Sequence, residues 1–172
     1  MLLSRAIARQ ELANQAERER LQLALESANI LSWEWNPQTQ QVYFDSRWKT
    51  ILGYQDDEIN DSLESWESRV HPEDIELVHE QIQKHIRGEI PIYENEHRLR
   101  CKDGSYRWNF ARGKVVEWNQ QGKPIRFIGI NYDISDRKEA ENKLRESQGI
   151  WRTLCDVTPA AIAMFDTQMR YL

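Results

Sequence analysis

The stretch EHRLRCKDGSYRWNFARGKVVEWNQQGKPIRFIGINYDISDRK, residues Glu96–Lys138, decides the fold. Two turn signals, Asp103-Gly104 and Gln121-Gly122-Lys123-Pro124, separate three runs that are rich in aromatic and β-branched residues. Runs of this kind, joined by short glycine-containing turns, are typical of antiparallel strands in hairpins. The sequence therefore predicts a three-stranded antiparallel meander over about residues 92–101, 106–118 and 125–134.

Two further strands and two helices are predicted before the meander. Leu31, Trp33 and Trp35 alternate with polar residues, which is the pattern of a half-buried strand, and Val42-Tyr43-Phe44 forms a second, shorter strand. A short helix ends before Gly53, polar turns follow through 56–66, and a longer helix runs from Pro72 to Gly88. Its core-facing stripe consists of Ile75, Val78, Ile82 and Ile86.

Five strands in the order two, helices, three indicate an α+β fold, with an antiparallel sheet and helices on one face. The last strand is apolar on both faces, so we expect it at the centre of the sheet with both faces covered. The helix-forming stretch 4–29 is a candidate cover. Alternatively this helix pairs with a copy of itself, packs its Leu21/Leu25/Ala28 end on the domain, or is simply solvated.

The chain divides into four predicted segments: a helical or coiled-coil linker over 1–29, the domain over 30–136, an outgoing linker helix over 137–154, and a final segment over 155–172. The outgoing helix carries a coiled-coil seam, and the final segment repeats the start of the domain at an offset of 131 residues, with Leu31 matching Ile162 and Trp33 matching Met164. We interpret the chain as part of a tandem array. The seam residues are Ala140, Leu144, Ser147, Trp151 and Leu154.

Composition excludes several classes of function. The chain has 172 residues and a net charge of −5, with no basic stripe, which argues against nucleic acid as a partner. It has no apolar run of the ~20 residues that span a bilayer. Cys101 and Cys155 lie far apart without a metal-binding spacing, so we expect a reduced, cytoplasmic location and no metal site. Membrane attachment elsewhere in a longer parent protein stays open.

The order of several short motifs resembles the PAS family of sensory domains over residues 24–138. The resemblance implies a sheet in the strand order 2-1-5-4-3 and a role in signal input, through a small ligand or through dimerisation, with an output domain such as a histidine kinase or a cyclic-dinucleotide enzyme. The matching motifs are Trp33-Glu34-Trp35, Leu52-Gly53-Tyr54, Trp66, His71-Pro72-Glu73-Asp74 and the run from Arg98 to Lys138.

The resemblance also allows cofactors to be considered. Flavin photosensors of the family carry a cysteine-containing helix of the type N-C-R-F-L-Q, and nothing similar occurs over 56–66, which argues against flavin. Haem-binding members use a histidine of the long helix, where His79 and His85 lie. A histidine on an amphipathic helix is more often solvated or hydrogen-bonded, so we do not expect haem, and the cofactor stays unknown.

Candidate pocket residues are His79 and four polar residues in strand positions, which could converge on a ligand between the sheet and the long helix. The alternative is that half of the strand residues face solvent. The strand candidates are Asn95, His97, Asn109 and Asn131.

Asp133, Ile134 and Ser135 form the junction between the last strand and the outgoing helix. Asp133 resembles the acidic residue of the family's D-I-T motif, which implies a role in signal coupling. A helix cap by Ser135 or Asp136 is the other reading of this junction.

No catalytic motif occurs in the sequence. The leading hypothesis is therefore a non-enzymatic signal-input and dimerisation module, a homodimer through its flanking helices, within a bacterial histidine kinase or diguanylate cyclase. The alternative is a ligand-free structural interaction domain. A small-molecule enzyme on this fold is the weakest hypothesis, because no acid/base pair or nucleophile is visible.

Overall fold

The computed structural model describes residues 2–157. The part of the chain that ends at Ile134 and the part that begins at Ser135 are separate compact units. The elements, in chain order, are α1 (Leu2–Ser27), β1 (Leu31–Asn36), β2 (Gln41–Phe44), α2 (Arg47–Ile51), α3 (Leu63–Glu67), α4 (Ile75–Ile86), β3 (Tyr93–Arg100), β4 (Tyr106–Trp118), β5 (Pro124–Asp133) and α5 (Ser135–Val157).

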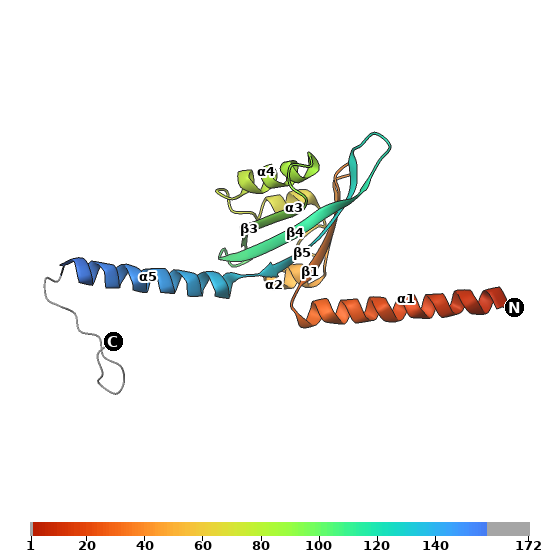
Figure 1. The fold of residues 1–172 in the computed structure, drawn as a ribbon, viewed down its shortest axis with the longest axis horizontal. Helices are drawn as coiled ribbons and strands as arrows, with labels where there is room; N and C mark the ends of the chain where they lie inside the picture. Colours follow the sequence, from red (N-terminus) through yellow and green to blue (C-terminus); the bar gives the residue numbers. More distant parts are fainter. Residues whose placement is uncertain (1, 158–172) are drawn as a thin grey trace, which may run out of the picture. The chain divides into compact units, whose positions relative to one another are not determined.

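The five strands form one sheet in the order β2-β1-β5-β4-β3 (Figure 1). All neighbouring strands are antiparallel, and β5 is hydrogen-bonded to β1 on one side and to β4 on the other. The predicted α+β class, the strand order and the central position of the last strand are confirmed.

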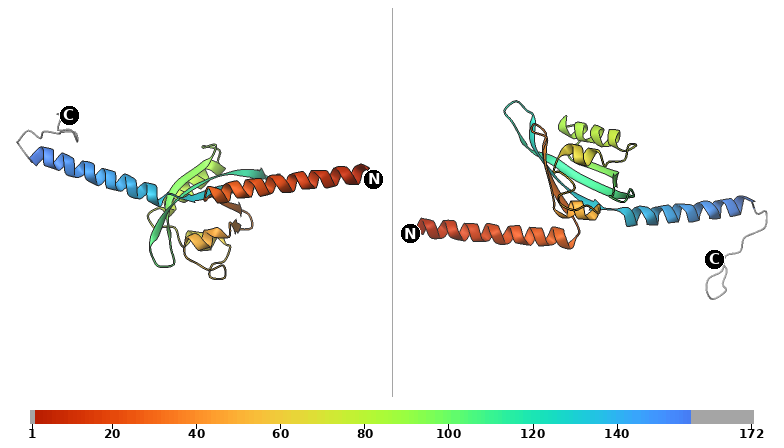
Figure 2. Two further views of the ribbon diagram at one scale, coloured as in Figure 1. Left: turned by 90° about the horizontal axis from the view of Figure 1, so that it is seen from below. Right: turned by 180° about the vertical axis from the view of Figure 1, so that it is seen from behind.

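Helices α3 and α4 lie over the same face of the sheet, here called the inner face (Figures 1 and 2). The apolar stripe of α4 explains its position, since Val78 is fully buried and Ile82 is 9% exposed. Burying such side chains stabilises the fold by roughly 1.5–3 kcal/mol each. The core beneath them includes Phe127, Trp48, Tyr93 and Leu31.

Two helix boundaries differ from the sequence prediction. The long helix begins at Ile75 rather than Pro72, and residues 72–74 form a turn. The Asp74 carboxylate accepts the backbone N–H of Arg98 at 2.8 Å and the Arg98 guanidinium at 2.6 Å, which ties this turn to β3. The short helix α3 lies partly in the segment predicted as turns. Ser62 caps it by accepting the Ser65 N–H at 3.2 Å.

The prediction that the N-terminal helix covers the second face of the sheet is wrong. Of the α1 side chains whose burial is described, only Leu25 is partly buried, and Leu21 is 56% exposed. The outer face instead carries half-buried Ile128 and Ile130 beside the ion pair of Arg126 with Glu34. The apolar residues on the outer face of β5 therefore lie on an open surface of the sheet, and α1 does not pack against them.

The outgoing helix α5 extends from Ser135 to Val157, beyond the predicted end of the linker at residue 154. The predicted second copy of the domain falls mainly on 158–172, which lie outside the described residues. The four-segment division of the chain stays a prediction. Across the described part of the chain, no helix has the length and apolar character needed to span a membrane.

Candidate functional site

Five residues, one from each strand, lie side by side in a row across the inner face of the sheet. Trp33 on β1 faces Phe44 on β2 and Gly129 on β5, while Gly113 on β4 faces Gly129 and Tyr93 on β3. The two glycines lack side chains, and the Trp33 indole fills the space above them. A Cβ atom on Gly113 would lie 2.7 Å from Trp33 Cη2, and one on Gly129 would also overlap the indole. Glycine is therefore required at both positions by close approach.

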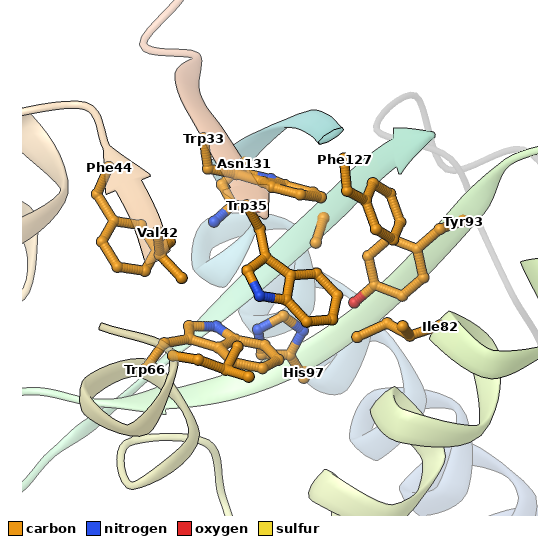
Figure 3. A pocket seen from close by; sticks show the side chains of 12 residues that line it. Trp33, Trp35, Val42, Phe44, Trp66, Ile82, Tyr93, His97, Phe127 and Asn131 are labelled. Atoms are coloured by element: carbon orange, nitrogen blue, oxygen red, sulfur yellow. The ribbon is translucent and has the colours of Figure 1, made fainter. Parts of the chain in front are cut away.

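Aromatic rings surround the Trp33 indole and define the candidate site. Phe127 lies at the centre, with ring centroids 5.2 Å from Trp33, 5.9 Å from Trp35 and 5.9 Å from Tyr93. Together with Trp66 of α3 these side chains line a cavity of about 50 Å³ between the sheet and the helices (Figure 3). The site is thus an aromatic cavity whose floor is the sheet.

All four polar strand candidates lie on the inner face and are buried, so the reading in which half of them face solvent is wrong. His97 and Asn131 line the cavity. Asn95 and Asn109 hold His97 in place, because Nδ1 of His97 lies 3.1 Å from Asn95 Oδ1 and Nε2 lies 3.3 Å from Asn109 Nδ2. A role for these residues in ligand binding stays a prediction.

His97 is an uncharged hydrogen-bonding group in this setting. The amide of Asn109 donates to Nε2, so Nδ1 carries the ring proton and donates it to Asn95 Oδ1. Burial lowers the pKa of His97 to about 4, and the charge of Asp74 opposes this only in part. The His97 ring therefore contributes no positive charge to the cavity at neutral pH.

Three buried polar atoms of cavity-lining residues have no hydrogen-bond partner among the described residues. They are the indole nitrogens of Trp33 and Trp35, which are donors, and Oδ1 of Asn131, which is an acceptor. Buried polar groups in proteins are nearly always satisfied, and an unsatisfied one costs roughly 1–3 kcal/mol. The residues that line this largely aromatic and aliphatic cavity therefore carry two unsatisfied donors and one unsatisfied acceptor.

The two histidines of α4 do not line the cavity. His79 is exposed and lies 2.8 Å from a carboxylate oxygen of Glu67. His85 is buried, but Val115 N–H donates to its Nε2 at 3.0 Å and its Nδ1 lies 3.0 Å from the Ile90 carbonyl oxygen. His79 is therefore misplaced as a pocket candidate, because its ring points to a neighbouring helix and solvent.

The predicted coupling residues Asp133, Ile134 and Ser135 link β5 to α5. The Asp133 carboxylate forms an ion pair with Arg107 of β4 at 2.7 Å. Ile134 is buried, and its N–H donates to the Trp108 carbonyl at 2.9 Å. Ser135 is the first residue of α5. The end of β5 is thus fastened to β4 immediately before the helix begins, and its role in signalling stays a prediction.

Sequence reasoning missed Gly113, Gly129 and Arg107. A single glycine inside a strand pattern indicates a close approach of neighbouring groups, so the two glycines could have been noticed. No comparable signal identified Arg107, because its pairing with Asp133 depends on strand register. Within residues 2–157, no group of three His, Cys, Asp or Glu side chains is placed to hold a metal ion.

Comparison with known proteins identifies the family. The family described as the PAS fold matches residues 41–131, which is more than half of the chain. The chain belongs to the PAS family. Its PAS domain is a signal-input domain and is not itself catalytic.

Similar proteins are signalling proteins. The PAS chain is 36% identical to a sensory box histidine kinase/response regulator from Burkholderia thailandensis E264, with a TM-score of 0.69, covering 78% of this chain and 99% of that structure. It is 29% identical to the N-terminal domain of a diguanylate cyclase with a PAS/PAC sensor from Marinobacter aquaeolei, with a TM-score of 0.55, covering 63% of this chain and 98% of that one.

Curated relatives are much longer than this chain. The probable diguanylate cyclase DgcE of Escherichia coli K12 is 26% identical over 94% of this chain and 14% of its own length. The two-component sensor PprA of Pseudomonas aeruginosa is 25% identical over 94% of this chain and 17% of its own length. The PAS chain therefore spans less than a fifth of these relatives.

Proposed function

We propose that this chain is the signal-input and dimerisation module of a longer signalling protein, and that a change at the inner-face cavity passes through β5 into α5. The observation that carries the proposal is the course of β5. This strand lines the cavity through Phe127 and Asn131, and only Ile134 separates its last residue, Asp133, from α5. A displacement of β5 by the cavity contents therefore has a direct covalent route into the helix.

The exposed apolar side chains of α5 support dimerisation. Leu144 is 61% exposed and Trp151 is 52% exposed, and both belong to the predicted seam. Most helical stability in proteins comes from packing of an apolar face, and pairing of the seam would supply such packing for α5. The proposed partner is a second copy of the same helix.

The dimer is tested by substitution in the seam. Leu144→Glu places a charge at a seam position, whereas Asn142→Glu places the same charge on the opposite side of the helix. Sedimentation velocity should show a dimer for the unchanged chain and for Asn142→Glu, and a monomer for Leu144→Glu. A monomer in all three samples, or an unchanged dimer for Leu144→Glu, would contradict a dimer through this seam.

The output of the parent protein is part of the same proposal. The similarity to histidine kinases and diguanylate cyclases supports one of these two activities in a domain that follows the PAS domain. The expectations of a cytoplasmic location and of no flavin or haem cofactor stay predictions.

A ligand-free interaction domain is the second candidate. The size of the cavity favours it, because about 50 Å³ is well below the roughly 300–1,000 Å³ of drug-sized ligand sites. Native mass spectrometry separates the two candidates. A retained small molecule supports signal input through the cavity, and a dimer of bare chains favours the interaction domain.

A further inference from the structure

The partnerless atoms of the cavity specify what can enter it. Within residues 2–157, the buried indole N–H groups of Trp33 and Trp35 have no acceptor, and the buried Oδ1 of Asn131 has no donor. Asn131 is 4% exposed and faces Ala111 on β4 and Leu31 on β1 in the sheet, neither of which has a polar side chain. An occupant that accepts from an indole and donates to Asn131 would satisfy atoms that the protein leaves unsatisfied.

The walls of the cavity exclude charged occupants. No Lys, Arg, Asp or Glu is among the described residues that line it, and its two ionisable rings carry no charge at neutral pH. His97 is held neutral by Asn95 and Asn109, and burial raises the pKa of the Tyr93 hydroxyl. A carboxylate or ammonium group entering this space would lose its hydration without gaining an opposite charge. The occupant must therefore be uncharged.

The volume of the cavity limits the occupant to a few heavy atoms. A water molecule needs about 10–15 Å³ of such space, and a dry cavity of about 150 Å³ holds benzene. The cavity here, of about 50 Å³, lies between these two cases. A chain of about four heavy atoms fits these limits, and an aromatic ring does not.

We propose that the inner-face cavity binds a small uncharged molecule with at least one hydroxyl group, of the short-chain alcohol or diol class. The hydroxyl hydrogen is donated to Asn131 Oδ1, and a hydroxyl oxygen accepts from the indole N–H of Trp33 or Trp35. The carbon atoms lie against the faces of the surrounding rings. This inference rests on the proposed function, since it takes the cavity as the site that receives the signal.

The test compares two probes of equal size on the full chain. Ethane-1,2-diol and acetate each have four heavy atoms, but only the diol is uncharged and can donate. Each of the seven tryptophans contributes one indole N–H signal to a ¹H–¹⁵N NMR spectrum, and Trp→Phe variants assign those of Trp33 and Trp35. The diol should shift these two signals to saturation, and acetate should bind at least tenfold more weakly.

Variants identify the role of Asn131. Asn131→Leu removes the acceptor at similar size and should weaken diol binding at least fivefold, whereas Asn60→Leu, at an exposed position, should not change it. Trp33→Phe and Trp35→Phe each remove one donor and keep a ring, and this pair of variants replaces Asn131→Leu if that chain does not fold. The proposal is overturned if the diol gives no saturable shift, if acetate binds equally well, if a folded Asn131→Leu chain binds the diol unchanged, or if Trp33→Phe and Trp35→Phe both leave diol binding unchanged.

The same samples distinguish this proposal from the proposed function. Sedimentation of each sample reports the dimer independently of the indole signals. A dimer that does not bind the diol overturns the ligand class and leaves the dimerisation module in place. A monomer that binds the diol overturns the dimerisation module and leaves the ligand class in place.

Discussion

Substituting Gly113 by alanine tests whether the Trp33 indole needs the space that the two glycines leave. The new methyl group would lie 2.7 Å from Trp33 Cη2, Trp33 Cζ2 and the Ile128 carbonyl oxygen, all shorter than a normal van der Waals contact. The carbonyl belongs to the central strand and has little freedom to move. The indole must therefore turn away from its position between Phe127 and Tyr93.

The expected cost is that of overpacking a well-packed core, about 1–3 kcal/mol. For a domain of this size that loss corresponds to a fall in melting temperature of roughly 4–8 °C for each kcal/mol. Thermal unfolding followed by circular dichroism measures it. Gly149→Ala is the matched control, because no atom of the described residues outside its own stretch of helix lies within 4 Å of the added methyl group, and the residue is exposed on α5.

A double variant isolates the contact with the indole. Trp33→Leu removes the ring that the methyl group meets, so Gly113→Ala should cost less in that background than in the unchanged chain. A melting temperature for Gly113→Ala within about 1 °C of the unchanged chain would show that the indole does not need this space, since a loss of 1 kcal/mol corresponds to roughly 4–8 °C. An equal cost with and without the indole would show that the clash lies elsewhere.

Three further predictions concern charge and helix register. Burial lowers the pKa of His97 to about 4. As the pH falls below about 6.5, His97 therefore becomes protonated in the unfolded chain but stays neutral in the folded chain. Stability is lost in this window, by about 2 kcal/mol between pH 7 and pH 5, and urea unfolding should show that His97→Gln removes this part of the pH dependence. If the free energy of unfolding depends on pH equally in the unchanged chain and in His97→Gln, His97 is not held neutral. Asp133→Ala breaks the pair with half-exposed Arg107, so it should lower the free energy of unfolding by less than about 1 kcal/mol while amide exchange at Ile134 and in the first turn of α5 becomes faster. Arg107→Ala should reproduce this result, and protection unchanged in both variants would argue against fastening by the pair. Inserting two residues near Glu141 rotates the seam, whereas inserting seven restores it, so in the full-length parent only the shorter insertion should abolish the response in an output assay. Equal responses to both insertions would refute signalling through helix register.

Much of the fold could be predicted because its strands carry local signals. Glycine turns and alternating residues defined β3, β4 and β5 to within about a residue, and the two-sided apolar pattern of β5 predicted its central position. The start of α4 was less predictable. Pro72 is a good first helical residue, but Asp74 bonds to Arg98 across the chain and holds the preceding turn open. Local propensity does not contain that long-range contact.

The site was predicted in type but not in detail. Asn95, His97, Asn109 and Asn131 were identified as polar residues in strands, and the structure places all four on one face, because each alternates in phase with a buried apolar neighbour. Their division into two that line the cavity and two that hold His97 depends on register between strands. The exposure of α1 was not predictable from its own sequence, because the sequence of a helix does not specify which surface the helix packs against.

The position of β5 affects how the domain withstands mechanical load. An edge strand can be peeled away one hydrogen bond at a time, but β5 is bonded along both sides, to β1 and to β4. Force arriving along the backbone from α5 is therefore divided between two ladders, and both must yield before the strand moves far. Under tension on α5, we therefore expect β5 to be displaced only slightly, and we do not expect the domain to unfold progressively from its C-terminal end.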